Sequence, residues 1–200
     1  FYRYQYKKDD PKSISSDTLW NLHIDRSGML WIATWGGGLN RFDPETEQFD
    51  HYGHDPDNPH SLSHNNVNSI YEDSTGALWI GTDGGGLNKL DRATGRFDHY
   101  RRDKENPHSI NENFILAIIE DLQGKLWIGT RKGGVDIFDR KTEQFHQLQY
   151  KTDHTRDSID KTVFTIHQDS NGMFWIGTQN GLYIFDEELE QLQHYKYDPN

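Results

Sequence analysis

The sequence predicts an all-β fold, a β-propeller made of four-stranded antiparallel blades, with four blades within its 200 residues. The first observation is a motif of strand, glycine turn and strand, which reads LWIGTDGGGLNKLD at residues 78–91 and occurs four times. Its tryptophans are evenly spaced, because 79 − 31, 127 − 79 and 175 − 127 all equal 48. A constant period of this length indicates a repeat architecture. The tryptophans of the motif are Trp31, Trp79, Trp127 and Trp175.

The second observation is that these strands carry apolar residues on both faces. Side chains alternate along a strand, so Leu78 and Ile80 point to one face and Trp79 to the other. Such a sheet needs another sheet against each of its faces. Four-stranded sheets stacked around an axis form a β-propeller, whereas a solenoid, the competing fold, usually has shorter periods and parallel strands.

Each period is expected to be a meander of four strands. In the second period the strands are expected at residues 67–72, 78–82, 87–91 and 97–100. The Asp-x-x-Gly sequence at residues 73–76 has the chemistry of a tight turn. The glycines at 84–86 allow the next reversal, since glycine adopts positive φ without steric cost.

The chain is expected to be a single propeller segment over residues 1–200. Residues 1–4 align with residues 49–52 one period later, so residues 1–8 are expected to be the outer strand of a preceding blade. Three arrangements remain open: an incomplete ring cut from a longer propeller, half of an eight-bladed ring made by two copies, or a closed four-bladed ring. The expected blades cover residues 18–55, 66–103, 114–150 and 162–200.

Long polar connections join each blade to the next, and each contains a serine followed by an aliphatic residue. Loops near a dozen residues are uncommon unless they are functional or packed internally. A pair that recurs in every loop favours an anchor that fixes the loop to its blade. The pairs are Ser13-Ile14, Ser61-Leu62, Ser109-Ile110 and Ser158-Ile159.

The composition limits the classes of partner. The formal net charge of −11 argues against nucleic acid and against anionic membrane surfaces. The absence of cysteine excludes a disulfide framework. The longest apolar run, residues 115–119, is far shorter than the roughly 20 residues of a membrane span, so direct membrane insertion of this segment is not expected.

The repeated residues resemble the two-component regulator propeller repeat. The resemblance rests on an aliphatic strand, Asp-x-x-Gly, Leu-Trp-Ile-Gly-Thr, a Gly-Gly-Leu turn, Phe-Asp and a Phe-x-x-Tyr-like end, in the same register in all four periods. Ala33 and Leu90 depart from the pattern, and one residue is missing near Gly181. The resemblance implies an extracytoplasmic propeller of a hybrid two-component sensor, located in the periplasm as part of an inner-membrane protein.

Positions that vary between repeats are the candidates for recognition, because columns held in every blade indicate scaffold. The meander places the turns after the second strand and the loops between blades on the same face of the ring. An aromatic ring with carboxylate, guanidinium and amide groups suits an oligosaccharide or another polar ligand; ordinary variation at tolerant turn positions is the alternative. The expected ligand-binding residues are Trp35, Asp83, Arg131, Lys132, Gln179, Asn180 and, on the innermost strand, Asn68.

The expected function is ligand sensing without catalysis in this segment, with no cofactor and no metal. The 11 histidines show no tight metal-ligand spacing, and no nucleophile–base pair or phosphate loop is found. Two alternatives stay open: a scaffold for protein contacts or dimerisation without a small ligand, and a propeller lyase or hydrolase. The open apolar faces of the first and last blades also predict self-association.

Overall fold

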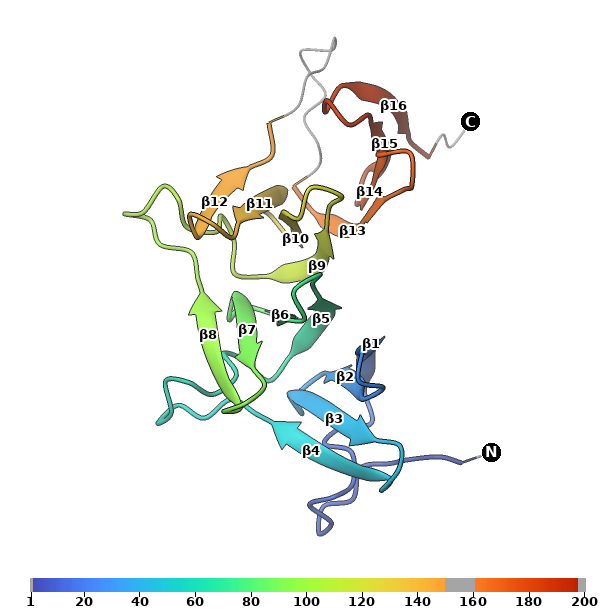
Figure 1. Ribbon diagram of the computed structural model, residues 1–200, viewed down its shortest axis with the longest axis vertical. Helices are drawn as coiled ribbons and strands as arrows, with labels where there is room; N and C mark the ends of the chain where they lie inside the picture. The colour runs from blue at the N-terminus through green and yellow to red at the C-terminus, as the bar shows by residue number, and fades with distance from the viewer. Residues whose placement is uncertain (1, 150–160, 198–200) are drawn as a thin grey trace. The chain divides into compact units, whose positions relative to one another are not determined.

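The computed structural model describes residues 2–149 and 161–197, and this part of the chain contains strands but no helix (Figure 1). Sixteen strands form four sheets of four strands each. In every sheet the strands lie in sequence order and each is antiparallel to the next. The predicted all-β fold of four-stranded antiparallel blades is therefore confirmed.

The chain divides into two compact units, residues 1–100 and residues 101–200. The first unit contains two sheets, named here blade 1 (β1–β4) and blade 2 (β5–β8). The strands of blade 1 are β1 (Leu19–Ile24), β2 (Leu30–Thr34), β3 (Leu39–Asp43) and β4 (Gln48–Tyr52). The strands of blade 2 are β5 (Val67–Glu72), β6 (Leu78–Thr82), β7 (Leu87–Asp91) and β8 (Arg96–Tyr100).

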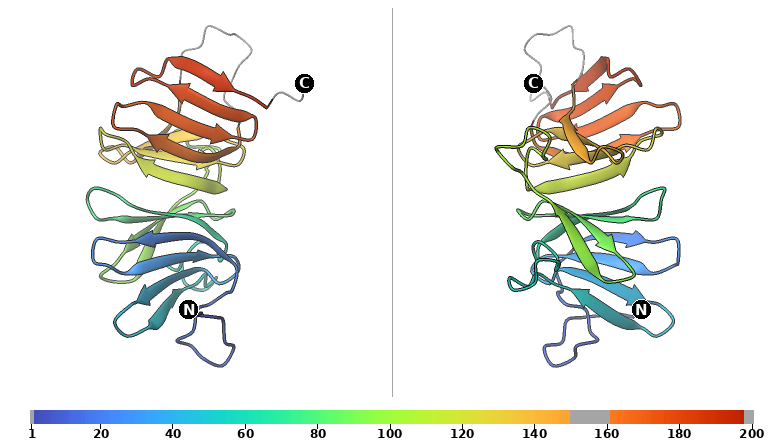
Figure 2. Two further views of the ribbon diagram at one scale, coloured as in Figure 1. Left: turned by 90° about the vertical axis from the view of Figure 1, so that its right-hand side faces the viewer. Right: turned by 60° about the vertical axis from the view of Figure 1, so that its left-hand side comes forward.

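The second unit contains blade 3 (β9–β12) and blade 4 (β13–β16). The strands of blade 3 are β9 (Ile115–Glu120), β10 (Leu126–Thr130), β11 (Val135–Asp139) and β12 (Gln144–Gln147). The strands of blade 4 are β13 (Val163–Gln168), β14 (Phe174–Thr178), β15 (Gly181–Phe185) and β16 (Gln191–Tyr195). Figure 2 shows that the two sheets of each unit lie face to face.

The Asp-x-x-Gly turn between the first two strands recurs in each blade, and it also holds the indole ring of the motif tryptophan. In blade 1 the Oδ1 atom of Asp25 accepts hydrogen bonds from the backbone amides of Ser27 and Met29, at 2.9 and 3.1 Å. Gly28 completes this turn with a φ of 86°, a backbone angle that residues other than glycine rarely adopt. The Oδ2 atom of Asp25 accepts the indole N–H of Trp31 at 2.7 Å. The same aspartate–indole bond occurs in blades 2, 3 and 4, from Asp73 to Trp79, Asp121 to Trp127 and Asp169 to Trp175.

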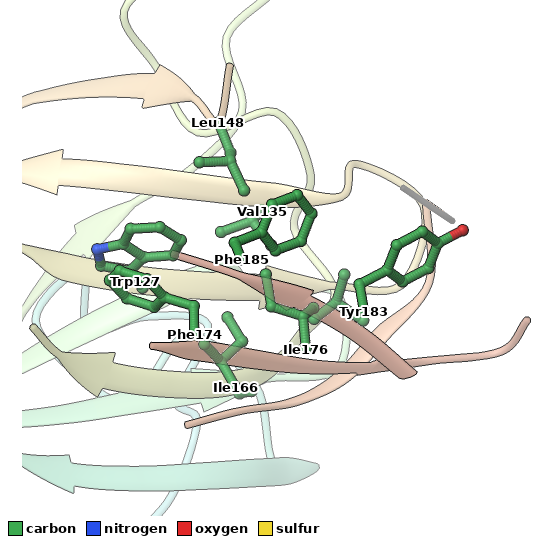
Figure 3. Packing of buried hydrophobic residues seen from close by; sticks show 10 residues of the cluster. Trp127, Val135, Leu148, Ile166, Phe174, Ile176, Tyr183 and Phe185 are labelled. Atoms are coloured by element: carbon green, nitrogen blue, oxygen red, sulfur yellow. The ribbon is translucent and has the colours of Figure 1, made fainter. Parts of the chain in front are cut away.

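The tryptophan of one blade packs against the next blade within each unit. In the first unit Trp31 of blade 1 shares a buried cluster with Val67, Ile70 and Leu78 of blade 2. In the second unit the ring of Trp127 stacks on Phe174 of blade 4, with ring centroids 4.0 Å apart and planes 19° apart (Figure 3). The predicted burial of apolar residues on both faces of a blade thus takes the form of a tryptophan-centred layer between two sheets.

The connections between blades are anchored by the predicted serine–aliphatic pairs. Ser61 Oγ accepts a hydrogen bond from the amide of Asp55 and donates one to the carbonyl of Asn58, both at 2.9 Å. Leu62 beside it is fully buried. Ser13-Ile14 and Ser109-Ile110 repeat this arrangement. The fourth pair, Ser158-Ile159, lies outside the described residues.

The outer strand expected at residues 1–8 does not form over residues 2–8. A strand requires hydrogen bonds to a neighbouring strand, and here the amide of Tyr6 bonds instead to Asp17 Oδ1 at 2.8 Å. The ring of Tyr4 nevertheless packs on Phe49 with centroids 5.6 Å apart, as the ring of Tyr52 packs on Phe97 at 6.0 Å. The alignment therefore agrees with the packing position of Tyr4, while the outer strand of a preceding blade at residues 1–8 stays a prediction.

Candidate functional site

The candidate residues other than Asn68 lie on the turns between the second and third strands of the blades, and hydrogen bonds hold the turns of blades 1 and 3 on both sides. In blade 1 the amide of Trp35 donates to the carbonyl of Thr18 at 2.9 Å. The amide of Gly38 donates to the carbonyl of Asn65, in the loop that leads into blade 2, also at 2.9 Å. The turn of blade 3 is held in the same way by Phe114 and Lys161. The backbone of the candidate site is therefore a fixed surface rather than a set of loose loops.

Trp35 forms an exposed aromatic pair with Trp20. The ring centroids are 5.9 Å apart and the planes are 40° apart. Trp20 is 59% exposed and Trp35 is 39% exposed, whereas Trp31 and Trp127 of the core are 2% exposed. Trp20 is not among the residues predicted to bind a ligand, so the structure adds it to the candidates. Its signal was present, because tryptophan stands alone in a column that otherwise holds Asn68, Leu116 and Phe164.

The other two candidates of the first unit lie at different depths. Asp83 is half-buried, and its amide donates to the carbonyl of Asn66 at 3.0 Å. Asn68 is only 3% exposed, so it is part of the interior of blade 2 and does not form a free surface. Of the predicted set in this unit, Trp35 is thus the residue most open to a ligand.

The remaining candidates belong to the second unit. The guanidinium of Arg131 lies over the ring of Phe114, 4.9 Å from its centroid. Lys132, Gln179 and Asn180 are at or near the surface, and the carbonyl of Asn180 lies 3.0 Å from Nε2 of His194. These four residues and the pair Trp35 and Asp83 are therefore in different units, and their sharing of one ligand surface stays a prediction.

Two cavities among the described residues lie away from these candidates. One cavity of about 240 Å³ is lined by the segment from Arg3 to Ile14 together with Glu47 and Phe49. A second, of about 540 Å³, is lined by residues of blade 2 between Thr75 and Asp98. Neither contains a predicted ligand-binding residue.

Two of the histidines serve the fold. The Nε2 atom of His51 lies 2.7 Å from the carbonyl oxygen of Ser13, and Nε2 of His99 lies 2.7 Å from that of Ser61. An imidazole N–H that donates to a loop carbonyl is part of the loop anchor. Within residues 2–149 and 161–197 no group of three or more histidine, aspartate and glutamate side chains has the arrangement of a metal site.

A buried carboxylate beneath the turn of blade 3 was not predicted. In blade 2 the side chain of Asn88 bonds to the amide and to the hydroxyl of Ser63, at 3.0 and 2.8 Å. In blade 3 the corresponding pair is Asp136 and Asn111, and Asp136 accepts from the Asn111 amide at 3.0 Å and from its Nδ2 atom at 2.5 Å. Burial raises the pKa of Asp136 to about 6, although both hydrogen bonds from Asn111 oppose the rise.

Replacing Asp136 by asparagine is expected to stabilise the protein at neutral pH. The pKa of about 6 in the fold exceeds the value near 3.9 of an unfolded aspartate, so the neutral form is favoured in the fold. Its contribution is complete below about pH 4 and is lost as the pH rises through about 6. The expected gain for Asp136→Asn above pH 7 is on the order of 2–3 kcal/mol, measured by urea unfolding. An equal difference between variant and parent at pH 4 and pH 8 would contradict it, and Asp98→Asn, at an exposed position of β8, is the control.

The chain matches the two component regulator propeller family over residues 61–84, 109–132 and 157–180. A search of curated proteins found no match. No helix among the described residues is long and apolar enough to cross a membrane.

Solved propeller structures resemble the chain over most of its length. The extracellular domain of BT3049 from B. thetaiotaomicron, assigned as a hybrid two component system, is 26% identical with a TM-score of 0.77, and the match covers 90% of this chain and 25% of that one. The extracellular domain of BT4673 from the same organism is 25% identical with a TM-score of 0.76, over 97% of this chain and 26% of that one. Virginiamycin B lyase from Staphylococcus aureus shares the fold alone, at 14% identity and a TM-score of 0.64, over 91% of this chain and 56% of that one.

The chain thus spans about a quarter of the two sensor domains that it matches.

Proposed function

Because the chain is built from two component regulator propeller repeats, we propose that it is a ligand-sensing module of a bacterial hybrid two-component sensor. The observation that carries this proposal is its likeness, at 25–26% identity and over at least 90% of its length, to extracellular domains assigned to such systems. The same likeness supports an extracytoplasmic, periplasmic location. In this function the propeller binds a signal molecule, and a kinase or similar output outside this segment reports it.

We propose an oligosaccharide as the ligand, bound on the face that carries the turns between the second and third strands. The exposed rings of Trp20 and Trp35 support this choice. A sugar ring presents a flat apolar side of C–H groups and an edge of hydroxyl groups, so it suits aromatic faces flanked by polar side chains. Asp83 in the same unit could accept hydrogen bonds from hydroxyl groups. Arg131, Lys132, Gln179 and Asn180 supply donors and acceptors on the corresponding turns of the second unit.

The test is a saccharide array followed by calorimetry with the variants Trp35→Ala and Trp20→Ala. Each is expected to weaken binding of an array hit by about 2 kcal/mol, roughly 30-fold in Kd, because a stacked ring is a typical binding hot spot. Trp175→Ala is the matched control, since Trp175 is similarly exposed, at 36%, but lies on β14 and is not part of the pair of Trp20 and Trp35. Equal affinity of parent, Trp35→Ala and Trp20→Ala for every hit would contradict the proposed site.

A scaffold function without a small ligand remains the second proposal, because blades 1 and 4 expose apolar side chains. In blade 1, Leu22 and Ile24 are 59% and 70% exposed. A chain that binds no saccharide on the array but associates through these side chains would favour this alternative over ligand sensing. An enzymatic function is supported only by fold likeness to propeller enzymes of low identity.

A further inference from the structure

Asp136 is a buried carboxylate to which neither the repeat nor the proposed recognition assigns a role. It lies on β11, and its side chain is fully buried. Its partners across the sheet, Ile128 on β10 and Gln147 on β12, carry no charge. A buried carboxylate is unfavourable unless its charge is paired or a proton neutralises it. The surroundings of Asp136 therefore decide which of these two states the fold prefers.

The equivalent residues of blades 1 and 2 are asparagines, and their bonds show which partners this position provides. Asn88 Oδ1 accepts the amide N–H of Ser63 at 3.0 Å, and Asn88 Nδ2 donates to Ser63 Oγ at 2.8 Å. The asparagine of blade 1 makes the same two bonds with its own serine. Asn88 Nδ2 also donates to the carbonyl oxygens of Ile80 and Gly86, at 3.3 and 3.4 Å. The Nδ2 side of this position therefore faces backbone acceptors.

Asp136 places an oxygen atom where these asparagines have a donating amide group. Its Oδ2 atom accepts the amide N–H of Asn111 at 3.0 Å, as Asn88 Oδ1 accepts that of Ser63. Its Oδ1 atom accepts from Asn111 Nδ2 at 2.5 Å and so takes the place of Asn88 Nδ2. An ionised carboxylate accepts hydrogen bonds only, whereas a protonated one also donates an O–H. Only the protonated form therefore supplies the hydrogen that the amide group supplies in blade 2.

The repeat places two backbone carbonyls on the Oδ1 side of Asp136. They are those of Ile128 and Gly134, which correspond in register to the two carbonyls near Asn88 Nδ2. A protonated Oδ1 can donate to one of these carbonyls. An ionised Oδ1 has no hydrogen to offer, and its negative charge is repelled by the negative end of each carbonyl dipole. The local geometry thus favours a proton on this oxygen atom.

The charged side chains around Asp136 do not compensate an ionised form. Burial raises the pKa of Asp136 to about 6, and the opposing influences are the two hydrogen bonds from Asn111 and no charge. The charged residues on the loop before blade 3, on the turn and on the segment that leads into blade 4 are Glu112, Arg131, Lys132 and Lys161.

We propose that Asp136 holds a proton on Oδ1 in one state of blade 3 and releases it to water in another, and that this proton fastens the turn at residues 130–134. Gly134 links the two, because its carbonyl also accepts the amide N–H and the hydroxyl of Thr130, at 3.0 and 2.9 Å. The turn also rests on the loop that holds Asn111, since a Cβ added at Gly133 would lie 3.3 Å from Asn111 Cβ.

The turn carries Arg131 and Lys132, so the proton on Asp136 controls how firmly these two side chains are held. Below about pH 6 the protonated form bonds to the carbonyl and fastens the turn, and above it the ionised form releases the turn. Recognition by Arg131 and Lys132 then depends on pH, and this consequence rests on the proposed function. The response of the turn itself requires no ligand.

The test is a pH titration of the isotopically labelled 200-residue chain by nuclear magnetic resonance. The carboxyl carbon of Asp136 is expected to titrate with a midpoint of about 6, so it binds a proton roughly 100-fold more tightly than an unfolded aspartate with a pKa near 3.9. The amide signals of Thr130 and Gly134 are expected to shift with the same midpoint. The control is the double variant Asp136→Asn with Asn111→Ser, which recreates the pair of blade 2, keeps every histidine and should lose this shift.

Three results would overturn the proposal. A carboxyl carbon of Asp136 that stays ionised down to about pH 4 would show that the fold holds no proton there. Constant amide signals of Thr130 and Gly134 while Asp136 titrates would show that the proton does not act on the turn. Equal shifts in the parent and in the double variant would assign them to another group. A saccharide array without a hit would count against the proposed function but not against this titration.

Discussion

Replacing Trp127 by alanine is expected to destabilise the protein by about 3–5 kcal/mol. The ring is 2% exposed and stacks on Phe174 at a centroid distance of 4.0 Å. Its loss removes the layer that joins blades 3 and 4 and leaves a cavity that rigid sheets cannot close. The indole N–H also bonds to Asp121 Oδ2 at 2.8 Å, so the carboxylate loses a buried partner. Urea unfolding followed by circular dichroism measures the change.

Trp175→Ala provides the matched control for this experiment. Trp175 occupies the same motif position in blade 4 and makes the same bond to an aspartate, but its ring is 36% exposed. Its loss is therefore expected to cost much less than the loss of Trp127. Equal destabilisation by the two replacements would show that the bond within the blade, and not packing between blades, explains the role of the tryptophan.

The second large effect is expected from Asp25→Ala, which should cost about 3–5 kcal/mol. The carboxylate is 4% exposed and accepts the indole N–H of Trp31 and a guanidinium N–H of Arg92, at 2.7 and 2.9 Å. Arg92 belongs to blade 2, so this one carboxylate connects the turn of blade 1, the core tryptophan and the next blade. Alanine leaves the indole and Arg92 without this acceptor and removes the bonds that shape the turn. The melting temperature and urea midpoint report the loss.

The pH dependence of Asp25 provides a second measurement. Burial alone would raise the pKa of Asp25, but the hydrogen bonds from Ser27, Trp31 and the Met29 amide, with the charge of Arg92, together lower it below its ordinary value. A lowered pKa in the fold means that the stabilisation is present above about pH 4 and is lost as the pH falls through the folded pKa. The difference between parent and Asp25→Ala should therefore shrink in acid. A difference that is the same at pH 7 and pH 2.5 would contradict the role of the charged form.

The repeated features of the fold were predictable from the sequence, because the residues that form each of them recur in all four periods. The spacing of the tryptophans gave the period, and the Leu-Trp-Ile strand required a neighbour on both faces. The Asp-x-x-Gly sequence predicted a turn but not the bond from Asp25 to Trp31, since six positions of separation do not reveal a contact. The outer strand of a preceding blade at residues 1–8 stays a prediction, because alignment shows which position a residue occupies and not which strand it pairs with.

Features that occur once were harder to predict. Trp20 lies on the innermost strand and was not predicted to bind a ligand, and only the structure shows its exposure beside Trp35. Asn68 was expected to face a ligand, but a polar residue on an inner strand can equally be buried with its own partners, and it is 3% exposed. Asp136 was overlooked because an aspartate at a position that holds asparagine in blades 1 and 2 looks like ordinary variation until its burial is known.

The central claim is that Trp31 and Trp127 are sealed between the two blades of their units, while Trp20 and Trp35 remain exposed. Hydrogen exchange of the indole N–H groups, followed by nuclear magnetic resonance, tests it most directly. The N–H groups of Trp31 and Trp127, which are bonded to buried aspartates, should exchange only when the fold opens, and those of Trp20 and Trp35 should exchange rapidly. Equally fast exchange at Trp31, Trp127, Trp20 and Trp35 would contradict the account.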